Sequence, residues 1–121
     1  MKKKIRFLIC ICTRNRKNNL FQILKSLSKL KLSSKISLKI IVVENKKKIN
    51  KKNIFKNKNI KFFTEKKIGI SFARNRCLRE AKNIKYNFLV FFDDDCIIDH
   101  NWLQENIKFI KKNKFDIITG P

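Results

Sequence analysis

Mainly apolar runs alternate with amphipathic stretches along the chain, and this alternation is its main structural signal. The runs fall at about residues 5–12, 38–43, 60–63, 87–92 and 115–119. The run at 87–92 contains β-branched and aromatic residues without polar alternation. Such a run is typical of a strand buried on both faces of a parallel sheet. We therefore expect five strands, with the strand at 87–92 in the middle of the sheet.

Apolar residues recur at helical spacing between these runs. The spacing predicts a first helix from about residue 18 to an exit at Ser33, a second over 71–82 with Ser71 as its N-cap, and a third over 101–112. The Lys- and Asn-rich stretch 46–59 predicts a loop or a poor surface helix. The order strand, helix, strand, strand, helix, strand, helix, strand predicts right-handed crossovers and a three-layer, mostly parallel α/β sheet.

Length and composition favour one folded domain, since the chain has 121 residues, of which 43% are hydrophobic. The net charge of +22 is suited to polyanions, either a nucleic acid or an anionic membrane surface in peripheral contact. However, the lysines are scattered along the whole chain together with Asn, Ile and Phe, which favours AT-rich coding as their origin. No nucleic-acid motif accompanies the charge, so we expect no specific nucleic-acid partner. A basic nucleic-acid-associated protein remains the alternative from another functional class.

The cysteines and the N-terminus favour an intracellular protein. Cys-x-x-Cys pairs are absent, which favours reduced thiols over a zinc site. The apolar segment after the first lysines is short and contains Arg6, so a buried strand fits it better than a signal peptide. No segment has the ~18 apolar residues that span a bilayer. We expect a cytoplasmic location, with peripheral binding at the cytoplasmic face of the membrane as a variant.

Polar clusters follow three of the expected strands: Thr13-Arg14-Asn15-Arg16, Glu44-Asn45 and Asp93-Asp94-Asp95. The carboxyl ends of parallel strands lie on one edge of a sheet, where open α/β sheets bind ligands. Three carboxylates repel one another unless a cation neutralises them, and oxygen ligands suit Mg²⁺ or Mn²⁺. The alternative is a solvated acidic turn that caps the next helix.

Two further side chains are candidate ligands for a nucleotide. Glu44 is able to accept a hydrogen bond from a base or a ribose, and Arg74 is able to reach a base carbonyl or a phosphate. The alternatives are an ordinary loop acid and a surface arginine of a helix. His100 is expected in a loop or at a helix start rather than as a base, and Asp99 as a cap of the third helix. Neither a Gly-x-Gly-x-x-Gly nor a Walker motif is present, which argues against a dinucleotide or P-loop site.

The chain resembles the N-terminal, nucleotide-binding half of family 2 glycosyltransferases with the GT-A fold. The matching segments are Ile11 to Arg16, Ile41 to Asn45, Gly69 to Asn75, and Phe91 to Asp95 followed by Trp102-Leu103, and together they cover nearly the whole chain. The resemblance implies a nucleotide-diphosphate sugar as donor and a glycan or lipid-linked acceptor, in cell-surface glycan synthesis. A metal-dependent nucleotidyltransferase that shares the acidic strand end is a further alternative.

The resemblance also implies roles for individual residues. It places Thr13, Glu44 and Arg74 around the base and ribose, and adds Asn15, Asn75, Asp93 and Asp94 to the substrate-binding set. Asp93-Asp94-Asp95 matches the family's Asp-x-Asp motif, in which the first acid, here Asp93, faces the ribose or the metal and the last, here Asp95, coordinates Mn²⁺ or Mg²⁺. Asp93 and Asp95 are therefore the expected metal ligands. The metal would bridge the diphosphate and stabilise the leaving nucleotide.

Four positions depart from the family pattern. Cys12 stands where Pro is usual, Arg14 where an aromatic residue is common, Glu44 in place of Asp, and Cys77 in place of a helix Gly. Similar enzymes also continue into an acceptor-binding half that carries the general base. The resemblance thus implies that residues 1–121 are the donor-binding portion, either of a truncated product or of a split enzyme completed by a second polypeptide.

Overall fold

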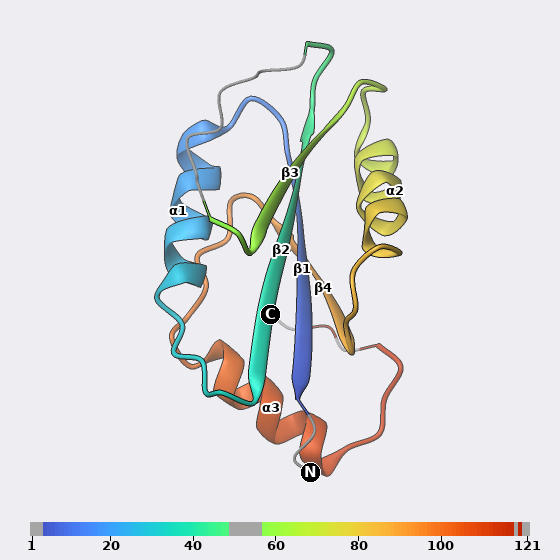
Figure 1. Ribbon diagram of the computed structural model, residues 1–121. Coiled ribbons are helices and arrows are strands. Elements are labelled where there is room, and N and C mark those ends of the chain that lie inside the picture. Colours follow the sequence, from blue (N-terminus) through green and yellow to red (C-terminus); the bar gives the residue numbers. More distant parts are fainter. Residues whose placement is uncertain (1–3, 49–56, 118, 120–121) are drawn as a thin grey trace.

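The computed structural model describes residues 4–48, 57–117 and 119. In this part of the chain, four strands form one sheet and three helices pack against it (Figure 1). The strands are β1 (Ile5–Thr13), β2 (Ile36–Asn45), β3 (Ile60–Glu65) and β4 (Phe88–Asp93). The helices are α1 (Lys17–Ser28), α2 (Ile70–Ala81) and α3 (Trp102–Lys112).

The sheet has the strand order β3-β2-β1-β4, and every neighbouring pair is parallel. Ile9 in β1 lies opposite Ile40 in β2 and Val90 in β4. The chain proceeds outward from β1 through β2 to β3, then returns to the far side of β1 as β4. The direction of the strand order therefore reverses between β1 and β4. This arrangement confirms the predicted parallel α/β sheet.

Helices cover both faces of the sheet, because the two crossovers run in opposite directions and right-handed crossovers then place their helices on opposite faces. Figure 1 shows α1 and α2 on either side of the strands. Side chains alternate along β1, so Ile9 and Ile11 face α1 and α3, whereas Leu8 and Cys10 face α2. The first face buries large Leu and Ile side chains from the helices. The second buries only small helix residues, namely Ala73, Cys77 and Ala81.

The strand predicted at 87–92 forms as β4, but the prediction that both its faces are buried is wrong. β4 is at the edge of the described sheet, and none of its residues is fully buried. Phe88, Val90 and Phe92 pack on the α1 and α3 side, whereas Phe91 is 42% exposed on the other side. The physical reason is that α2 lies mainly over β1 and β2 and does not extend across β4.

The strand predicted at 115–119 is also not formed, since residues 113–117 and 119 adopt no strand. Phe115 instead packs its ring against Phe88 of β4 and Phe109 of α3, at centroid distances of 6.0 and 5.6 Å. Phe115 thus packs against neighbouring rings, whereas Ile117 of the same segment is 84% exposed.

Helix boundaries differ from the expected ones for local reasons. α1 ends at Ser28 rather than near Ser33, and Leu30 reaches the core from a turn in which its N–H donates to the Leu27 carbonyl. α2 begins at Ile70 with Gly69 as its N-cap, so the prediction of Ser71 as N-cap is wrong. Gly69 has a φ of +146°, a backbone conformation that glycine adopts without strain.

The prediction that Asp99 caps α3 is wrong, because the N-cap is Asn101 and no side-chain hydrogen bond caps this helix. The Asp99 carboxylate instead accepts a hydrogen bond from the N–H of Asn101 at 3.0 Å, within the turn before the helix. His100 lies in this turn with an 86% exposed side chain. No helix in the described residues is long and apolar enough to cross a membrane. Of the stretch 46–59, residues 49–56 lie outside the described part, and the residues on either side of that gap form turns or irregular structure.

Candidate functional site

An open cleft of about 430 Å³ lies at the carboxyl end of the sheet, where the strand order reverses between β1 and β4. Open α/β sheets bind ligands at such switch points, because the loops after the two strands diverge to opposite faces there. The cleft is lined by the end of β1, the start of α2 and the acids after β4: Cys12, Thr13, Arg14, Arg16, Asn45, Gly69, Ile70, Ala73, Asp93, Asp94 and Asp95.

Asp94 is a buried acid that joins the two strand ends across the cleft floor. It is 6% exposed, and its carboxylate accepts a hydrogen bond from the Thr13 hydroxyl at 2.8 Å. Its other oxygen is 3.2 Å from the Arg16 guanidinium. Thr13 itself is only 7% exposed. The carboxylate is therefore occupied by the protein, and it holds Arg16 at the cleft.

Asp93 and Asp95, on either side of Asp94, are exposed to solvent and line the cleft. Asp93 is 75% exposed in its side chain and has Arg74 at 3.9 Å. In the described part of the chain, no three His, Cys, Asp or Glu side chains converge as a ready metal cage. Mg²⁺ and Mn²⁺ sites that act on phosphates commonly use only one or two carboxylates, with the remaining ligands from phosphate and water. The pair Asp93 and Asp95 fits that chemistry.

Positively charged groups also line the cleft. Arg14 and Arg16 line the cleft, and α1 begins directly after Arg16. Neither α1 nor α2 has an acidic residue in its first turn or a side-chain cap at its N-terminus. Their first N–H groups thus retain the partial positive charge of a helix N-terminus. A cleft lined by both carboxylates and cationic groups suits a ligand that combines phosphates with a divalent cation.

Asn45 fixes the wall that α2 contributes to the cleft. This residue is 5% exposed, and its amide donates to the carbonyls of Glu65 and Lys67 at 3.0 and 2.8 Å. Its Oδ1 accepts from the N–H of Gly69 at 2.9 Å. Asn45 therefore holds the connection from β3 to α2, and every hydrogen-bonding atom of its amide group has a protein partner.

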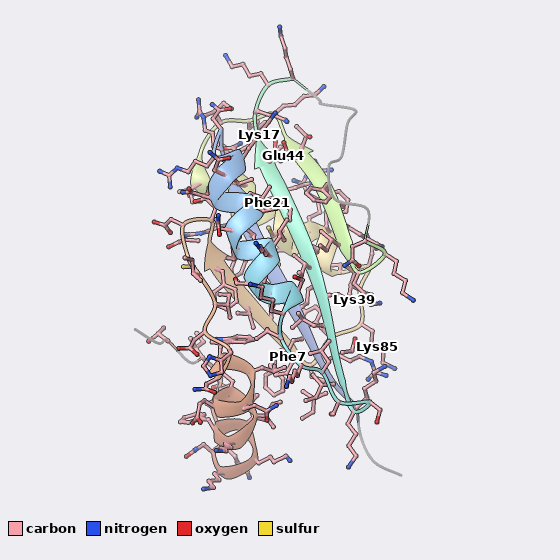
Figure 2. All side chains as sticks on the ribbon, turned by 90° about the vertical axis from the view of Figure 1, so that its left-hand side faces the viewer. Phe7, Lys17, Phe21, Lys39, Glu44 and Lys85 are labelled. Atoms are coloured by element: carbon pink, nitrogen blue, oxygen red, sulfur yellow. The ribbon has the colours of Figure 1, made fainter. Side chains whose placement is uncertain are left out.

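The remaining predicted residues lie at the same edge but do not line the cleft. Figure 2 shows Glu44 and Lys17 at one end of the molecule and Phe7 toward the other. Glu44 is half-buried and forms an ion pair with Lys46. Asn15 is exposed in the turn after β1 with a φ of +54°, which Asn tolerates better than most residues. Asn75 is exposed on α2.

Seven residues that line the cleft are absent from the predicted site: Cys12, Arg14, Arg16, Asn45, Gly69, Ile70 and Ala73. Arg16 belongs to the polar cluster after β1, but its pairing with Asp94, 78 residues away, leaves no sequence signal. The Sγ of Cys12 is 3.7 Å from the Sγ of Cys77 in α2. The contact between these thiols and their burial raises the pKa of Cys12. Contact with Cys10, together with burial, raises the pKa of Cys77 to about 12.

The fold and cleft define an α/β domain that presents carboxylates and arginines at a strand-order switch point. Residues 8–121 match the sequence model of glycosyl transferase family 2. Because the match covers nearly the whole chain, this protein belongs to glycosyl transferase family 2. No curated protein sequence matches the chain.

Solved structures show the same fold. A crystal structure of residues 1–349 of S. aureus TarS is similar with a TM-score of 0.70 and 22% identity, covering 89% of this chain and 33% of that one. A further S. aureus TarS structure is similar with a TM-score of 0.66 and 20% identity, covering 89% of this chain and 20% of that one. The likeness agrees with the predicted GT-A fold. The chain spans a third or less of these relatives.

Proposed function

We propose that this domain binds a nucleotide-diphosphate sugar in the cleft and that the whole enzyme transfers the sugar to a glycan or lipid-linked acceptor. The observation that carries the proposal is that two exposed acids, Asp93 and Asp95, and two arginines, Arg14 and Arg16, line the same cleft at the switch point. Membership of glycosyl transferase family 2 supports the same reading. We further propose that the enzyme acts in the cytoplasm and contacts the membrane peripherally through its basic surface. Its product would belong to a cell-surface glycan.

Asp93 and Asp95 would hold Mn²⁺ or Mg²⁺, which acts as a Lewis acid on the diphosphate of the donor. Arg16, held by Asp94 at 3.2 Å, would place its guanidinium beside the diphosphate. The N-terminus of α2, which also lines the cleft, would add N–H donors. Each of these groups would stabilise the negative charge that develops on the leaving nucleotide. Catalysis would then depend in part on this electrostatic stabilisation of the transition state.

Asp94 has a different role in this proposal from the one the family resemblance implies. Its carboxylate already accepts from Thr13 and Arg16, which leaves little capacity for a direct bond to the nucleotide. We assign Asp94 as a positioning residue and keep Asp93 and Asp95 as ligand-binding acids. Glu44, Arg74, Asn15 and Asn75 remain candidate contacts for the base and ribose outside the cleft lining.

Calorimetric titration with uridine diphosphate and other nucleoside diphosphates tests the proposal. We expect binding in Mn²⁺ and much weaker binding with a chelator. The Asp95→Asn variant should lose about tenfold to hundredfold of the Mn²⁺-dependent affinity, the value of one charge-assisted contact. Asp116→Asn is the control, since Asp116 is an exposed acid outside the cleft lining.

The outcomes distinguish the two parts of the proposal. Unchanged Mn²⁺-dependent binding in Asp95→Asn would reject the metal role of this acid while leaving nucleotide binding intact. Failure of every nucleoside diphosphate and nucleotide sugar to bind, with and without Mn²⁺, would reject donor binding itself.

A further inference from the structure

Three thiols meet where β1 packs against α2. Cys10 and Cys12 are two residues apart in β1 and project from the same face of the sheet, toward Cys77. The sulfur atoms of Cys12 and Cys77 are 3.7 Å apart, and Cys77 also contacts the thiol of Cys10. The two cysteines at 12 and 77 are distant in sequence, and only the packing of α2 on the sheet brings them together.

Exposure distinguishes the three thiols. Cys10 and Cys77 are fully buried, at 0% exposure, whereas Cys12 is half-buried and lines the cleft. A reagent in the cleft therefore meets the sulfur of Cys12 first. The sulfur of Cys77 lies behind it, close enough to attack a modified Cys12.

We propose that Cys12 and Cys77 form an oxidisable dithiol that reacts with a low-molecular-weight disulfide. The Cys12 thiolate attacks one sulfur of that disulfide, forms a mixed disulfide and releases one small thiolate. The Cys77 thiolate then attacks the Sγ of Cys12, forms the Cys12–Cys77 bond and releases the second small thiolate. The two protons lost by the cysteines are taken up by the two leaving thiolates, so one disulfide is reduced as the other forms.

The crosslink changes both the cleft and the stability of the domain. The sulfur atoms must approach from 3.7 Å to about 2.05 Å, which draws the end of β1 toward α2. The bond also closes a long loop of the unfolded chain, which stabilises the folded form. Because the thiolate is the attacking species in each step, the exchange should become faster as the pH rises.

The test treats the reduced chain with oxidised glutathione at mildly alkaline pH, followed by non-reducing peptide mapping by mass spectrometry. We expect a peptide pair joined through Cys12 and Cys77, with the intact mass lower by about 2 Da. The Cys77→Ala variant should instead retain glutathione on Cys12. Cys96→Ser is the matched control and should form the same disulfide as the unaltered chain.

A second readout is thermal unfolding, in which the oxidised chain should melt several degrees above the reduced chain. The Cys12→Ser variant should show no such shift. This variant keeps the proposal testable if Cys77→Ala does not fold. A persistent glutathione adduct on Cys12 in the unaltered chain would overturn the proposal. So would a disulfide through Cys10 or Cys96, or an oxidised form that melts no higher than the reduced one.

Discussion

The two ends of the β1–β4 strand pair have opposite chemistry. At the amino end, Phe7 of β1 stacks on Phe88 of β4 at 5.6 Å and contacts Trp102 of α3 at 6.1 Å. At the carboxyl end, β4 finishes in three acids, and Asp94 pairs with Thr13 and Arg16. Aromatic packing contributes to stability without needing polar partners. The charged end contributes less to stability and keeps two of its acids available for a ligand.

The three consecutive acids illustrate the same contrast within one segment. Asp94 is buried and fully engaged, whereas Asp93 and Asp95 are exposed on either side of it. Asp93 ends β4, and Asp94 and Asp95 lie in the turn after it. Thus one acid belongs to the framework and its neighbours belong to the candidate site.

The largest expected effect is at the aromatic end. Phe7→Ala should lower the free energy of unfolding by about 3–5 kcal/mol, because it removes a ring that is 3% exposed and leaves a cavity beside two aromatic partners. Urea denaturation measures this loss. Ile117→Ala is the control and should change stability by no more than about 0.5 kcal/mol, since Ile117 is 84% exposed. Equal losses in the two variants would contradict the assignment of this end as the stabilising one.

Asp94 should have the next largest effect, although it lies at the charged end. Asp94→Ala should cost about 2–3 kcal/mol, because it leaves the buried Thr13 hydroxyl without its acceptor. Asp94→Asn retains an acceptor for Thr13 and should cost about 1 kcal/mol, since the Arg16 side chain is 57% exposed and its ion pair is partly screened. Denaturant unfolding compares the two variants. If both were as stable as the unaltered chain, Asp94 would not belong to the framework.

The smallest effect concerns Glu65, at the end of β3. The N–H of Lys67, which donates to this carboxylate at 3.0 Å, and the nearby Arg79 hold the pKa of Glu65 below its ordinary value of 4.5. A lowered folded-state pKa means that the stabilisation is present above about pH 4.5 and is lost as the pH falls through the folded-state pKa. Glu65→Gln should therefore show a shallower fall in unfolding free energy below that pH. Glu105→Gln, an exposed acid on α3, serves as control and should keep the full slope.

Much of the fold was predictable because its signals are local. Apolar runs identified all four strands of the described sheet, and helical spacing identified all three helices there. The errors arose where packing between distant segments determines whether a segment is buried or forms a strand. Nothing in residues 87–92 indicates that β4 lies at an edge, because a strand that is exposed on one side has the same apolar composition as a buried one. The segment 115–119 was likewise interpreted as a strand, although Phe115 uses its ring for aromatic packing.

The candidate site was predictable in part. The carboxyl ends of parallel strands share an edge, so the convergence of Thr13 and Asp93–Asp95 follows from the strand assignment. The sequence did not indicate that Asp94 faces inward while its neighbours face the cleft. It likewise did not indicate that Glu44 pairs with Lys46 rather than lining the cleft. These differences depend on side-chain direction and on partners many residues away.

The sequence by itself indicated the four strands and three helices of the described residues, the parallel α/β class and the family, because periodicity and motif spacing are properties of short segments. Only the tertiary structure decided which side chains meet: Asp94 with Thr13 and Arg16, Asn45 with Gly69, and Cys12 with Cys77. Each of these contacts joins segments that are 24 or more residues apart. Strand order and the placement of α2 on the sheet bring these segments together, and both are consequences of burying the whole core at once.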